Sequence, residues 1–400
     1  MKWLFKYVSF KWWLLLLGLY PLCRFADGSY ATGTVRAPII KKNQGVGLNV
    51  TFVTWNLAQC SPSKADCAFL SQAGAGSSIF VIGLQEVEIL KPRRQEGRRS
   101  RLIRNIICSN LRKEFVPIST TRLGSIQMFV FLRKSMKRHI EPASVRTWEV
   151  SCGVGNVLQN KGALGMSMNI CGHRLAFISA HLAAHQSKVG ARNTDFWRIM
   201  RESEKFLSEN CNNVDYEQGD EESGIRPGGK STGSNYWDRS DDEEEEEEEE
   251  EECDMNSYDF PSLENFDCII FGGDLNYRLD LSREEVQLCL EDASKGDAIA
   301  SLLDHDQLTH ARVSEAAFSG FLEGAINFPP TFKYDKRCDT YDTSKKRRVP
   351  AWTDRVLYRA PPGVATLLKY DAIAKSRHSD HRAVLAKFLL QSIKSEKDGE

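Results

Sequence analysis

Short apolar segments rich in β-branched and aromatic residues recur along the chain after residue 46, as in domains whose strands are buried on both faces. The pattern predicts six strands: Leu48–Trp55, Ile79–Leu84, Leu175–Ser179, Cys268–Gly272, Arg355–Tyr358 and Ala383–Leu390. The residues before them show little periodicity. One large domain is therefore expected over residues 47–393, with a separate segment at 1–46 and a tail at 394–400.

Two segments between the predicted strands have the 3.6-residue periodicity of a helix. Asn193 is a candidate N-cap for the first, whose apolar positions are Phe196, Ile199, Met200, Phe206 and Leu207. Ser282 and Glu285 have the spacing of a capping box and open the second. Strands that alternate with helices predict an α/β layered domain.

Residues 210–262 interrupt this pattern, because they are rich in Gly, Ser, Asn, Asp and Glu. They include an unbroken run of 12 acidic residues from Asp241 to Glu252. Like charges at this density repel one another and leave no apolar surface to bury, so we expect a solvated, disordered insertion. An inert spacer is the simplest interpretation. An autoinhibitory loop that competes for a basic site, or a site for calcium or a protein, are the alternatives.

The charge balance of the rest of the chain is basic. The net charge of −1 becomes +11 when the 12 acidic residues of the run are left out. Such a surface suits a phosphorylated small molecule, an anionic membrane or a nucleic acid. The eleven cysteines form no CxxC pair and lack zinc-finger spacing, so we expect ordinary thiols and a reducing compartment.

The N-terminal segment contains a possible targeting signal. Residues Trp12–Cys23 are uncharged and largely apolar, and Lys2, Lys6 and Lys11 precede them. A spanning helix needs about 20 apolar residues and a signal peptide about 7 to 15, so the length fits a secretory signal. A basic and aromatic segment that lies in the membrane interface, and a strand of the core, are the competing interpretations.

Polar side chains stand at one end of each predicted strand. In the four early strands they follow the apolar run: Asn56, then Gln85 and Glu86, then His181, then Asp274 and Asn276. In the two late strands they precede it: Asp354, then Asp380 and His381. If the late strands run antiparallel to the early ones, all six groups meet at one edge.

This set of side chains favours metal-assisted hydrolysis. Carboxylate and amide oxygens suit a hard cation, while His and Asn can stabilise charge on a phosphoryl group. Gly272 and Gly273 come directly before Asp274 as a tight exit from a predicted strand and do not form a phosphate-binding loop, which disfavours hydrolysis of a nucleoside triphosphate. Each residue alone is more often a turn or core residue, so the prediction depends on the six groups together.

Eight segments together resemble a known motif series. They begin at Thr54 (TWN), Gly83 (GLQE), Asn160 (NKGA), His181 (HLAAH), Gly273 (GDLNYR), Pro330 (PTFKYD), Pro350 (PAWTDR) and Ser379 (SDH). In this order they resemble the inositol polyphosphate 5-phosphatases, which belong to the endonuclease, exonuclease and phosphatase superfamily. The resemblance implies a DNase I-like α/β fold, a four-layer sandwich of two mixed β-sheets flanked by helices.

The resemblance also implies roles for particular side chains. Glu86 would bind Mg²⁺ with Asn56 nearby and Asp380 beside the metal region. Asp274 would orient or deprotonate the attacking water, and Asn276 would hold that water or a phosphoryl oxygen. His181 and His381 would donate hydrogen bonds to the scissile phosphate, and Asp354 would set the tautomer of His381. The substrate-binding residues would be Lys161, Lys333, Tyr334, Lys346 and Arg348.

One position departs from the family's pattern. Phe332 stands where many members carry Tyr, which implies the loss of one hydroxyl contact to the substrate's 4-phosphate. A single hydrogen bond of this kind contributes about 1 kcal/mol at most. Lys346 and Arg348 would bind the same phosphate, Arg348 through its bidentate fork.

We therefore expect a Mg²⁺-dependent phosphatase that removes the 5-phosphate from phosphoinositides or soluble inositol polyphosphates, by direct in-line attack of water. We expect it at the cytoplasmic face of a membrane, in contact with that surface and not with nucleic acid. A nuclease or phosphodiesterase of the same superfamily, a catalytically inactive membrane-binding module, and a secretory location through a cleaved signal are the alternatives. The preference for lipid or soluble substrate, the tolerance of a 3-phosphate and the oligomeric state stay open.

Overall fold

The computed structural model describes residues 47–391, apart from 89–95, 154–159, 212–259 and 292–294. The N-terminal segment, most of the acidic insertion and the tail lie outside the described residues, so the predictions about them stay predictions. Within the described residues, no helix is long and apolar enough to cross a membrane. The eight described cysteines are free thiols, as expected from their spacing.

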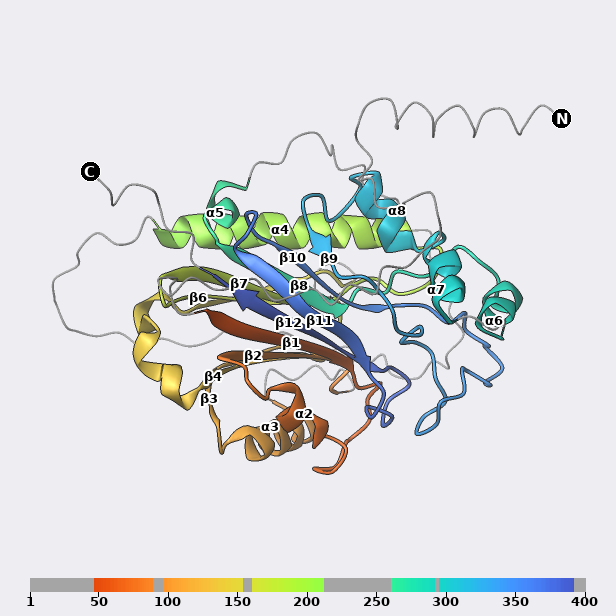
Figure 1. Ribbon diagram of the computed structural model, residues 1–400, viewed down its shortest axis with the longest axis horizontal. Helices are drawn as coiled ribbons and strands as arrows, with labels where there is room; N and C mark the ends of the chain where they lie inside the picture. The colour runs from red at the N-terminus through yellow and green to blue at the C-terminus, as the bar shows by residue number, and fades with distance from the viewer. Residues whose placement is uncertain (1–46, 89–95, 154–159, 212–259, 292–294, 392–400) are drawn as a thin grey trace, which may run out of the picture. The chain divides into compact units, whose positions relative to one another are not determined.

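The domain is built on two mixed sheets of six strands each (Figure 1). The first has the order β11 (Ala365–Ile373), β12 (Ala383–Leu390), β1 (Leu48–Asn56), β2 (Ile79–Gln85), β4 (Ile126–Arg133), β3 (Phe115–Leu123). The second has the order β5 (Arg146–Ser151), β6 (Gly162–Ile170), β7 (His173–His181), β8 (Cys268–Asp274), β10 (Asp354–Arg359), β9 (Leu322–Glu323). The six predicted strands are confirmed to within two residues at each end.

Strand direction matches the expectation for the late strands. The pairs β1 with β2 and β7 with β8 are parallel. Strand β12 runs antiparallel to β1, and β10 runs antiparallel to β8. The polar groups that follow the early strands and precede the late ones therefore lie at the same end of their sheets.

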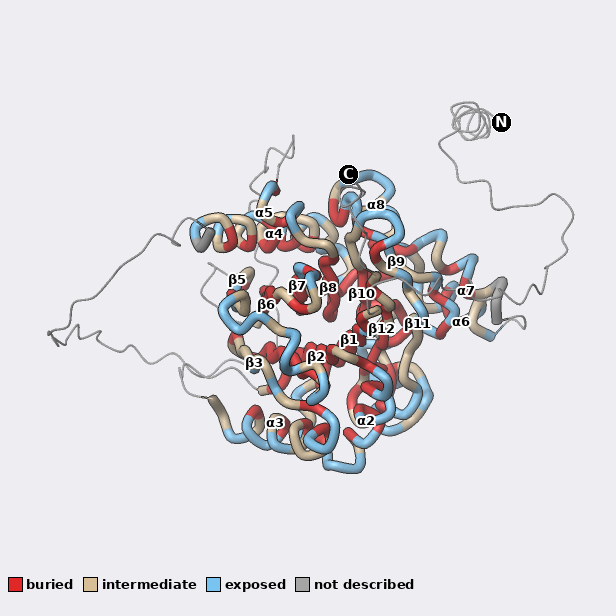
Figure 2. The backbone as a smooth tube through the Cα atoms, turned by 60° about the vertical axis from the view of Figure 1, so that its left-hand side comes forward, coloured by how far each residue is buried: buried red, intermediate tan, exposed pale blue. Residues whose placement is uncertain are grey.

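The inner faces of the two sheets form the central core. Phe52 and Val130 of the first sheet belong to one buried cluster with Met166, Phe177 and Ile270 of the second. The strands in the middle of the domain are accordingly buried over most of their length (Figure 2). Burial of apolar surface on this scale is what holds the two sheets face to face.

Helices cover the outer face of each sheet (Figure 1). Helices α2 (Phe69–Ala73) and α3 (Arg98–Leu111) pack on the first sheet, and α4 (Val189–Cys211), α5 (Pro261–Glu264) and α8 (Gln307–Val313) pack on the second. Helices α6 (Arg283–Glu291) and α7 (Lys295–Leu303), with the 3₁₀ turns η1 (Lys134–His139) and η2 (Pro142–Ser144), complete the described elements. The expected four-layer sandwich is confirmed.

Two local predictions had different outcomes. The capping box is confirmed, because the backbone N–H and the hydroxyl of Ser282 both donate to Glu285 Oε2, each at 2.7 Å. The N-cap assignment was wrong, because α4 begins at Val189 and Asn193 lies inside it. There Asn193 Oδ1 accepts a hydrogen bond from the Tyr277 hydroxyl at 2.7 Å, so its polar group serves a tertiary contact.

The boundaries of the acidic insertion are narrower than predicted. Residues 210 and 211 belong to α4, which continues the helical pattern beyond the expected end. At the other end Phe260 is buried and α5 has begun at Pro261. Glu204 of α4 accepts the backbone N–H groups of Ser262 and Leu263, so this end of the insertion is bonded to the domain.

Candidate active site

The strand ends bring the predicted polar groups together. Asn56 at the end of β1 is in register with Gln85 of β2, the residue before Glu86. Asp274 at the end of β8 is in register with His181 of β7 on one side and with Asp354 of β10 on the other. Because the side chains come from both sheets, the site exists only when the sandwich is assembled.

Asp274 is the centre of this arrangement. The side chain is 2% exposed, and its Oδ2 accepts a hydrogen bond from Asn56 Nδ2 at 2.8 Å and lies 3.4 Å from His181 Nε2. Burial alone would raise the pKa of this carboxyl group. The hydrogen bond from His181 and the positive charges of His381 and Lys161 outweigh burial, so the pKa lies below its ordinary value. Asp274 is therefore a carboxylate at every physiological pH.

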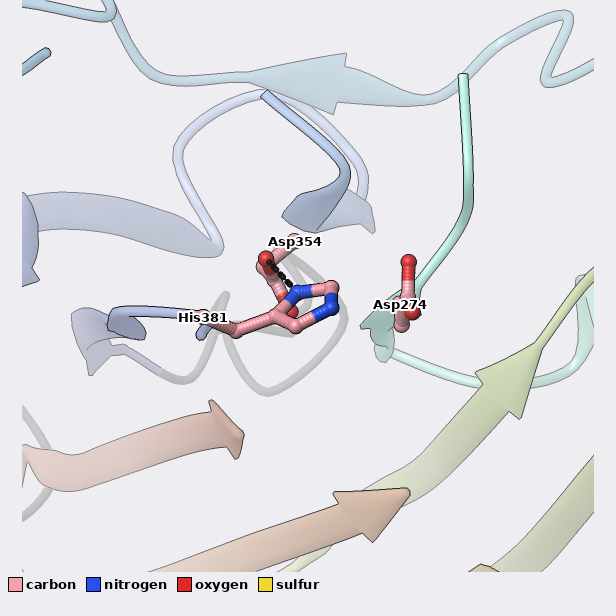
Figure 3. A group of neighbouring side chains, drawn as sticks. All are labelled: Asp274, Asp354 and His381. Atoms are coloured by element: carbon pink, nitrogen blue, oxygen red, sulfur yellow. Dashed lines mark hydrogen bonds and ion pairs between the residues drawn. The ribbon is translucent and has the colours of Figure 1, made fainter. Parts of the chain in front are cut away.

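His381 and Asp354 form a buried pair beside Asp274. His381 Nδ1 lies 2.9 Å from Asp354 Oδ2, which also accepts hydrogen bonds from the hydroxyls of Thr331 and Thr353. Burial would lower the pKa of His381, but the charge and hydrogen bond of Asp354 raise it to about 10. Figure 3 shows the imidazole ring between the two carboxylates. The ring is therefore an imidazolium at neutral pH and can donate from its second nitrogen.

A cavity of about 240 Å³ opens above these groups. Three acidic residues line it, namely Glu86, Asp274 and Asp380. Five cationic residues line it as well, namely Lys161, Arg278, Lys333, Lys346 and Arg348. The remaining lining residues are Ala184, His185, Asn276, Phe332 and His381. Five cations around a small cavity favour a substrate that carries several negative charges.

Glu86 is the residue that best fits a hard cation. It follows β2 in a left-handed backbone conformation with φ of 51°, which turns the side chain into the cavity. Asn56 Nδ2 donates to Glu86 Oε1 at 3.1 Å, and Asn56 Oδ1 accepts the N–H of Ala58. Asn56 therefore orients Glu86 through its amide nitrogen, while its oxygen holds the turn after β1. An oriented carboxylate that opens to a solvent cavity is a suitable ligand for Mg²⁺.

Another group also has the spacing of metal ligands. Ligand atoms of Asp274, Asp354 and His381 all lie within 4.8 Å of one another. However, His381 Nδ1 is bonded to Asp354, and the pair holds a proton at neutral pH. A protonated imidazole cannot ligate a metal, so the donor chemistry favours Glu86 over this group.

Lys161 extends the network on the other side of His181. Its Nζ lies 2.7 Å from His181 Nε2. Burial lowers the pKa of the Lys161 ammonium, and the nearby carboxylates of Asp274 and Glu86 only partly oppose this. Lys161 therefore releases its proton more readily than an exposed lysine does.

Comparisons with known proteins place the chain in a family. The sequence matches the model of endonuclease/exonuclease/phosphatase family 2 over residues 53–387. The chain belongs to this family. The resemblance inferred from the motifs is thereby confirmed.

Members of the family with related sequences include named 5-phosphatases. The chain is 28% identical to the type II inositol polyphosphate 5-phosphatase 15 of Arabidopsis thaliana, over 85% of the chain and 31% of that protein. It is 26% identical to the inositol polyphosphate 5-phosphatase K of Mus musculus, over 84% of the chain and 60% of that protein. Other relatives are longer, and the chain covers 21% of the synaptojanin of Caenorhabditis elegans.

Solved structures share the fold. The inositol polyphosphate 5-phosphatase domain of a synaptojanin, in complex with inositol (1,4)-bisphosphate and calcium, has a TM-score of 0.64 at 24% identity, over 88% of this chain and 87% of that chain. A nitrophorin from Cimex, as a ferrous NO complex, has a TM-score of 0.60 at 18% identity, over 86% and 99%. Because one fold serves such different ligands, the function must be argued from the side chains of the site.

Tyr334 is the predicted substrate-binding residue that the structure does not bring into the cavity. Its hydroxyl lies 2.9 Å from the carbonyl oxygen of Pro330 and 3.0 Å from the hydroxyl of Tyr341. The guanidinium of Arg382 covers its ring at 3.9 Å. The side chain is thus buried and satisfied within its own loop. Its backbone N–H, bonded to the carbonyl oxygen of Asp380 at 2.8 Å, fixes the position of that loop.

Asn276 lines the cavity, but both ends of its amide are already bonded. Nδ2 donates to the carbonyl oxygen of Leu182 at 3.0 Å, and Oδ1 accepts from Arg278 Nη2 at 2.7 Å. This geometry makes Asn276 a support for Arg278 more directly than a ligand of the attacking water.

Arg278 is a site residue that the sequence pattern did not predict, although it is the last residue of the GDLNYR segment. Arg278 lines the cavity and its guanidinium lies 4.6 Å from the centre of the Phe332 ring. The same ring lies beside His381, with 4.6 Å between ring centres. Phe332 therefore packs between two cationic groups of the site. The signal that could have identified Arg278 was its position two residues after Asn276, a predicted site residue.

The buried carboxyl group of Asp195, in α4, gives a test of how burial changes a pKa near the site. Burial raises its pKa to about 7, although Oδ2 accepts the backbone N–H of Ala183 at 2.8 Å. Between pH 4 and pH 7 the folded protein keeps a proton that the unfolded chain loses, so this group reduces stability as the pH rises. Asp195→Asn mimics the protonated form. We expect the variant to gain about 2 °C or more in Tm, relative to wild type, between pH 4.5 and pH 7.5. A difference in Tm that does not change with pH would contradict the raised pKa.

Proposed function

We propose that the chain is an inositol polyphosphate 5-phosphatase that hydrolyses the 5-phosphate of phosphoinositides or soluble inositol polyphosphates. The observation that carries the proposal is the cavity at the strand ends, where Asp274 and His381 meet five cationic side chains. His181 lies behind the cavity, with its Nε2 3.4 Å from Asp274 Oδ2. A polyanionic substrate suits this balance of charge. The names of relatives support the substrate class, among them the phosphatidylinositol 4,5-bisphosphate 5-phosphatase A of Homo sapiens, 27% identical over 86% of this chain and 31% of that protein.

In this proposal the attacking water is oriented by Asp274. The carboxylate stays ionised because its pKa is low, so it accepts a hydrogen bond from water at any physiological pH. The same low basicity favours orientation of the water over complete removal of its proton before attack. His381, held protonated by Asp354, donates to a phosphoryl oxygen whose charge grows in the transition state. The chain shows no Ser or Cys nucleophile motif, so transfer is direct to water.

We propose Mg²⁺ as the cofactor, with Glu86 as its main ligand and Asp380 beside it. Both carboxylates line the cavity, and Asn56 orients Glu86. When bound, the ion neutralises charge on the phosphoryl oxygens and on the leaving alkoxide. Lys333 Nζ lies 3.8 Å from Asp380 Oδ2, so Lys333 can balance this carboxylate or turn toward a substrate phosphate.

Removal of the metal should abolish activity. EDTA is expected to stop phosphate release and added Mg²⁺ to restore it, whereas Glu86→Gln should need a much higher Mg²⁺ concentration for half-maximal rate, by about 10-fold to 100-fold. The measurement is phosphate release against Mg²⁺ concentration. Glu88→Gln serves as control, because Glu88 accepts backbone N–H groups of Gly97 and Arg99 instead of lining the cavity. Full activity in EDTA would contradict the metal assignment.

The experiment that tests the proposed function is a panel of substrates with Mg²⁺ present. We expect inorganic phosphate from inositol lipids and soluble inositol polyphosphates that carry a 5-phosphate, and none from matched compounds without it. Supercoiled plasmid should stay intact. Nicking of the plasmid without phosphate release would favour the nuclease, and no turnover on any substrate would favour an inactive binding module.

We also propose that residues 1–46 attach the enzyme to a membrane. Burial of Trp12, Trp13 and the four leucines that follow contributes a few kcal/mol at about 25 cal/mol per Å², and each lysine adds about 1 kcal/mol near anionic lipid. Deletion of residues 1–34 should leave turnover of a soluble substrate within about twofold and lower turnover on vesicles, with partial release of wild type by salt. A native protein that begins after Ala26, as measured by mass spectrometry, would instead indicate a cleaved signal peptide.

A further inference from the structure

Among the buried polar atoms of the described residues that have no hydrogen-bond partner, three lie on strands β2 and β7 beneath the site. They are Gln85 Nε2, Ser179 Oγ and His181 Nδ1. Gln85 and Ser179 are fully buried and His181 is 2% exposed. Buried polar groups are nearly always bonded to protein or to an ordered water, so three orphans in one region indicate a shared partner.

Gln85 and Ser179 reach the same small space between the sheets. Strand β2 faces β7 across the sandwich, and Gly83 lies at the contact. A Cβ atom on Gly83 would lie 2.2 Å from Ser179 Oγ and 3.6 Å from Gln85 Nε2. The two atoms do not bond to each other, yet both lie within a few ångström of this point. Two unbonded polar atoms that both lie this close to one point can share a bridging water.

His181 completes the group from the same strand as Ser179. The two residues are two positions apart on β7, so their side chains share the face that points into the sandwich. His181 Nε2 is directed at Lys161 and Asp274, which leaves Nδ1 as the ring nitrogen without a partner.

We propose that a single buried water, held by Gln85 and Ser179, bonds to His181 Nδ1, and that Gln85 and Ser179 are thereby positioning residues for His181. The catalytic consequence rests on the proposed phosphatase function. The water and the tautomer of His181 do not depend on it.

The balance of donors and acceptors decides which nitrogen of His181 carries the proton. Thr54 Oγ1 donates to Gln85 Oε1 at 3.3 Å, so the amide nitrogen of Gln85, with two N–H donors, faces the water. A water that accepts from Gln85 keeps its own hydrogens to donate, one of them to Nδ1. Nε2 lies 3.4 Å from Asp274 Oδ2, which can only accept, and 2.7 Å from Lys161 Nζ, which can accept from Nε2 only as the neutral amine toward which its lowered pKa shifts it. Nδ1 is therefore an acceptor, and the proton lies on Nε2. In that tautomer His181 donates toward Asp274, whose carboxylate lines the cavity.

NMR of protein labelled with ¹⁵N-histidine tests this directly. The signals of His181 are those that disappear in His181→Gln. In wild type we expect the neutral ring to carry its proton on Nε2. In Gln85→Met, which keeps side-chain volume, and in Ser179→Ala, the fraction with the proton on Nδ1 should rise. The kcat should fall about tenfold with KM within about twofold, as for other partners that orient a functional histidine.

Ser77→Ala is the matched control. Ser77 is a buried hydroxyl near the other end of β2, bonded to Thr51 Oγ1 at 2.6 Å, so its loss costs a buried hydrogen bond away from the site. We expect the tautomer of His181 and kcat to stay as in wild type. A wild-type ring protonated on Nδ1, or folded Gln85→Met and Ser179→Ala proteins with an unchanged tautomer, would overturn the proposal. The wild-type spectrum decides even if a variant fails to fold. Absence of phosphatase activity would refute the function while the NMR result stands.

Discussion

Asp274→Asn is expected to lower kcat by about 10² to 10⁴ while the protein keeps its fold. The substitution preserves the size of the side chain and an oxygen that can accept from Asn56 Nδ2, which lies 2.8 Å away. It removes the negative charge that orients water and that helps to keep His381 protonated. Steady-state phosphate release and thermal unfolding measure the two effects separately.

Asp267→Asn is the matched control for this prediction. Asp267 lies just before the opposite end of β8 and accepts the backbone N–H of Arg174 at 2.7 Å. Asp267 carries the same charge as Asp274 but lies beyond the other end of β8, away from the cavity. The kcat of Asp267→Asn should therefore stay within about twofold of wild type. An Asp274→Asn protein that is folded and fully active would refute the assignment of Asp274.

The double variant Lys346→Ala with Arg348→Ala is expected to lower kcat/KM by about 10² or more on substrates with a 4-phosphate. Each charge-assisted bond is worth roughly 1.5 to 3 kcal/mol, and both side chains line the cavity. The backbone of Arg348 is bonded to Asp342 and to Arg283, and alanine keeps both bonds. An analogue without the 4-phosphate should lose much less.

The same loop offers a control with equal loss of charge. Lys345 and Arg347 are exposed, and Arg347 contacts Glu284 of α6 at 3.5 Å. Lys345→Ala with Arg347→Ala should affect both substrates only slightly, because an exposed ion pair contributes little. If the double variant of Lys346 and Arg348 lost equally on both substrates, these residues would support the loop or general attraction instead of the 4-phosphate.

Sequence pattern predicted six of the strands but not every buried one, since β4 and β6 are buried over most of their length and were not predicted. The six predicted strands are largely buried on both faces, so they appear as mainly apolar runs. The polar residues after the early runs and before the late ones mark one end of the sheets. Strands β3 and β5 carried no such run, because one face of each is partly exposed and the residues alternate with polar ones. The start of α4 was misjudged for a related reason, since Asn193 looks like a cap until Tyr277 is seen beside it.

By itself the sequence determined six of the strands, the polar residues at their ends and the family, because these depend on local pattern and on short motifs. Only the tertiary structure decided which side chains enter the cavity. Tyr334 is turned inward by Tyr341 and Arg382, whereas Arg278 is held toward the cavity by Asn276 and Phe332. It also decided that His381 is charged, since burial against Asp354 sets that pKa. Contacts between segments far apart in the chain carry no local signal, and charge depends on them.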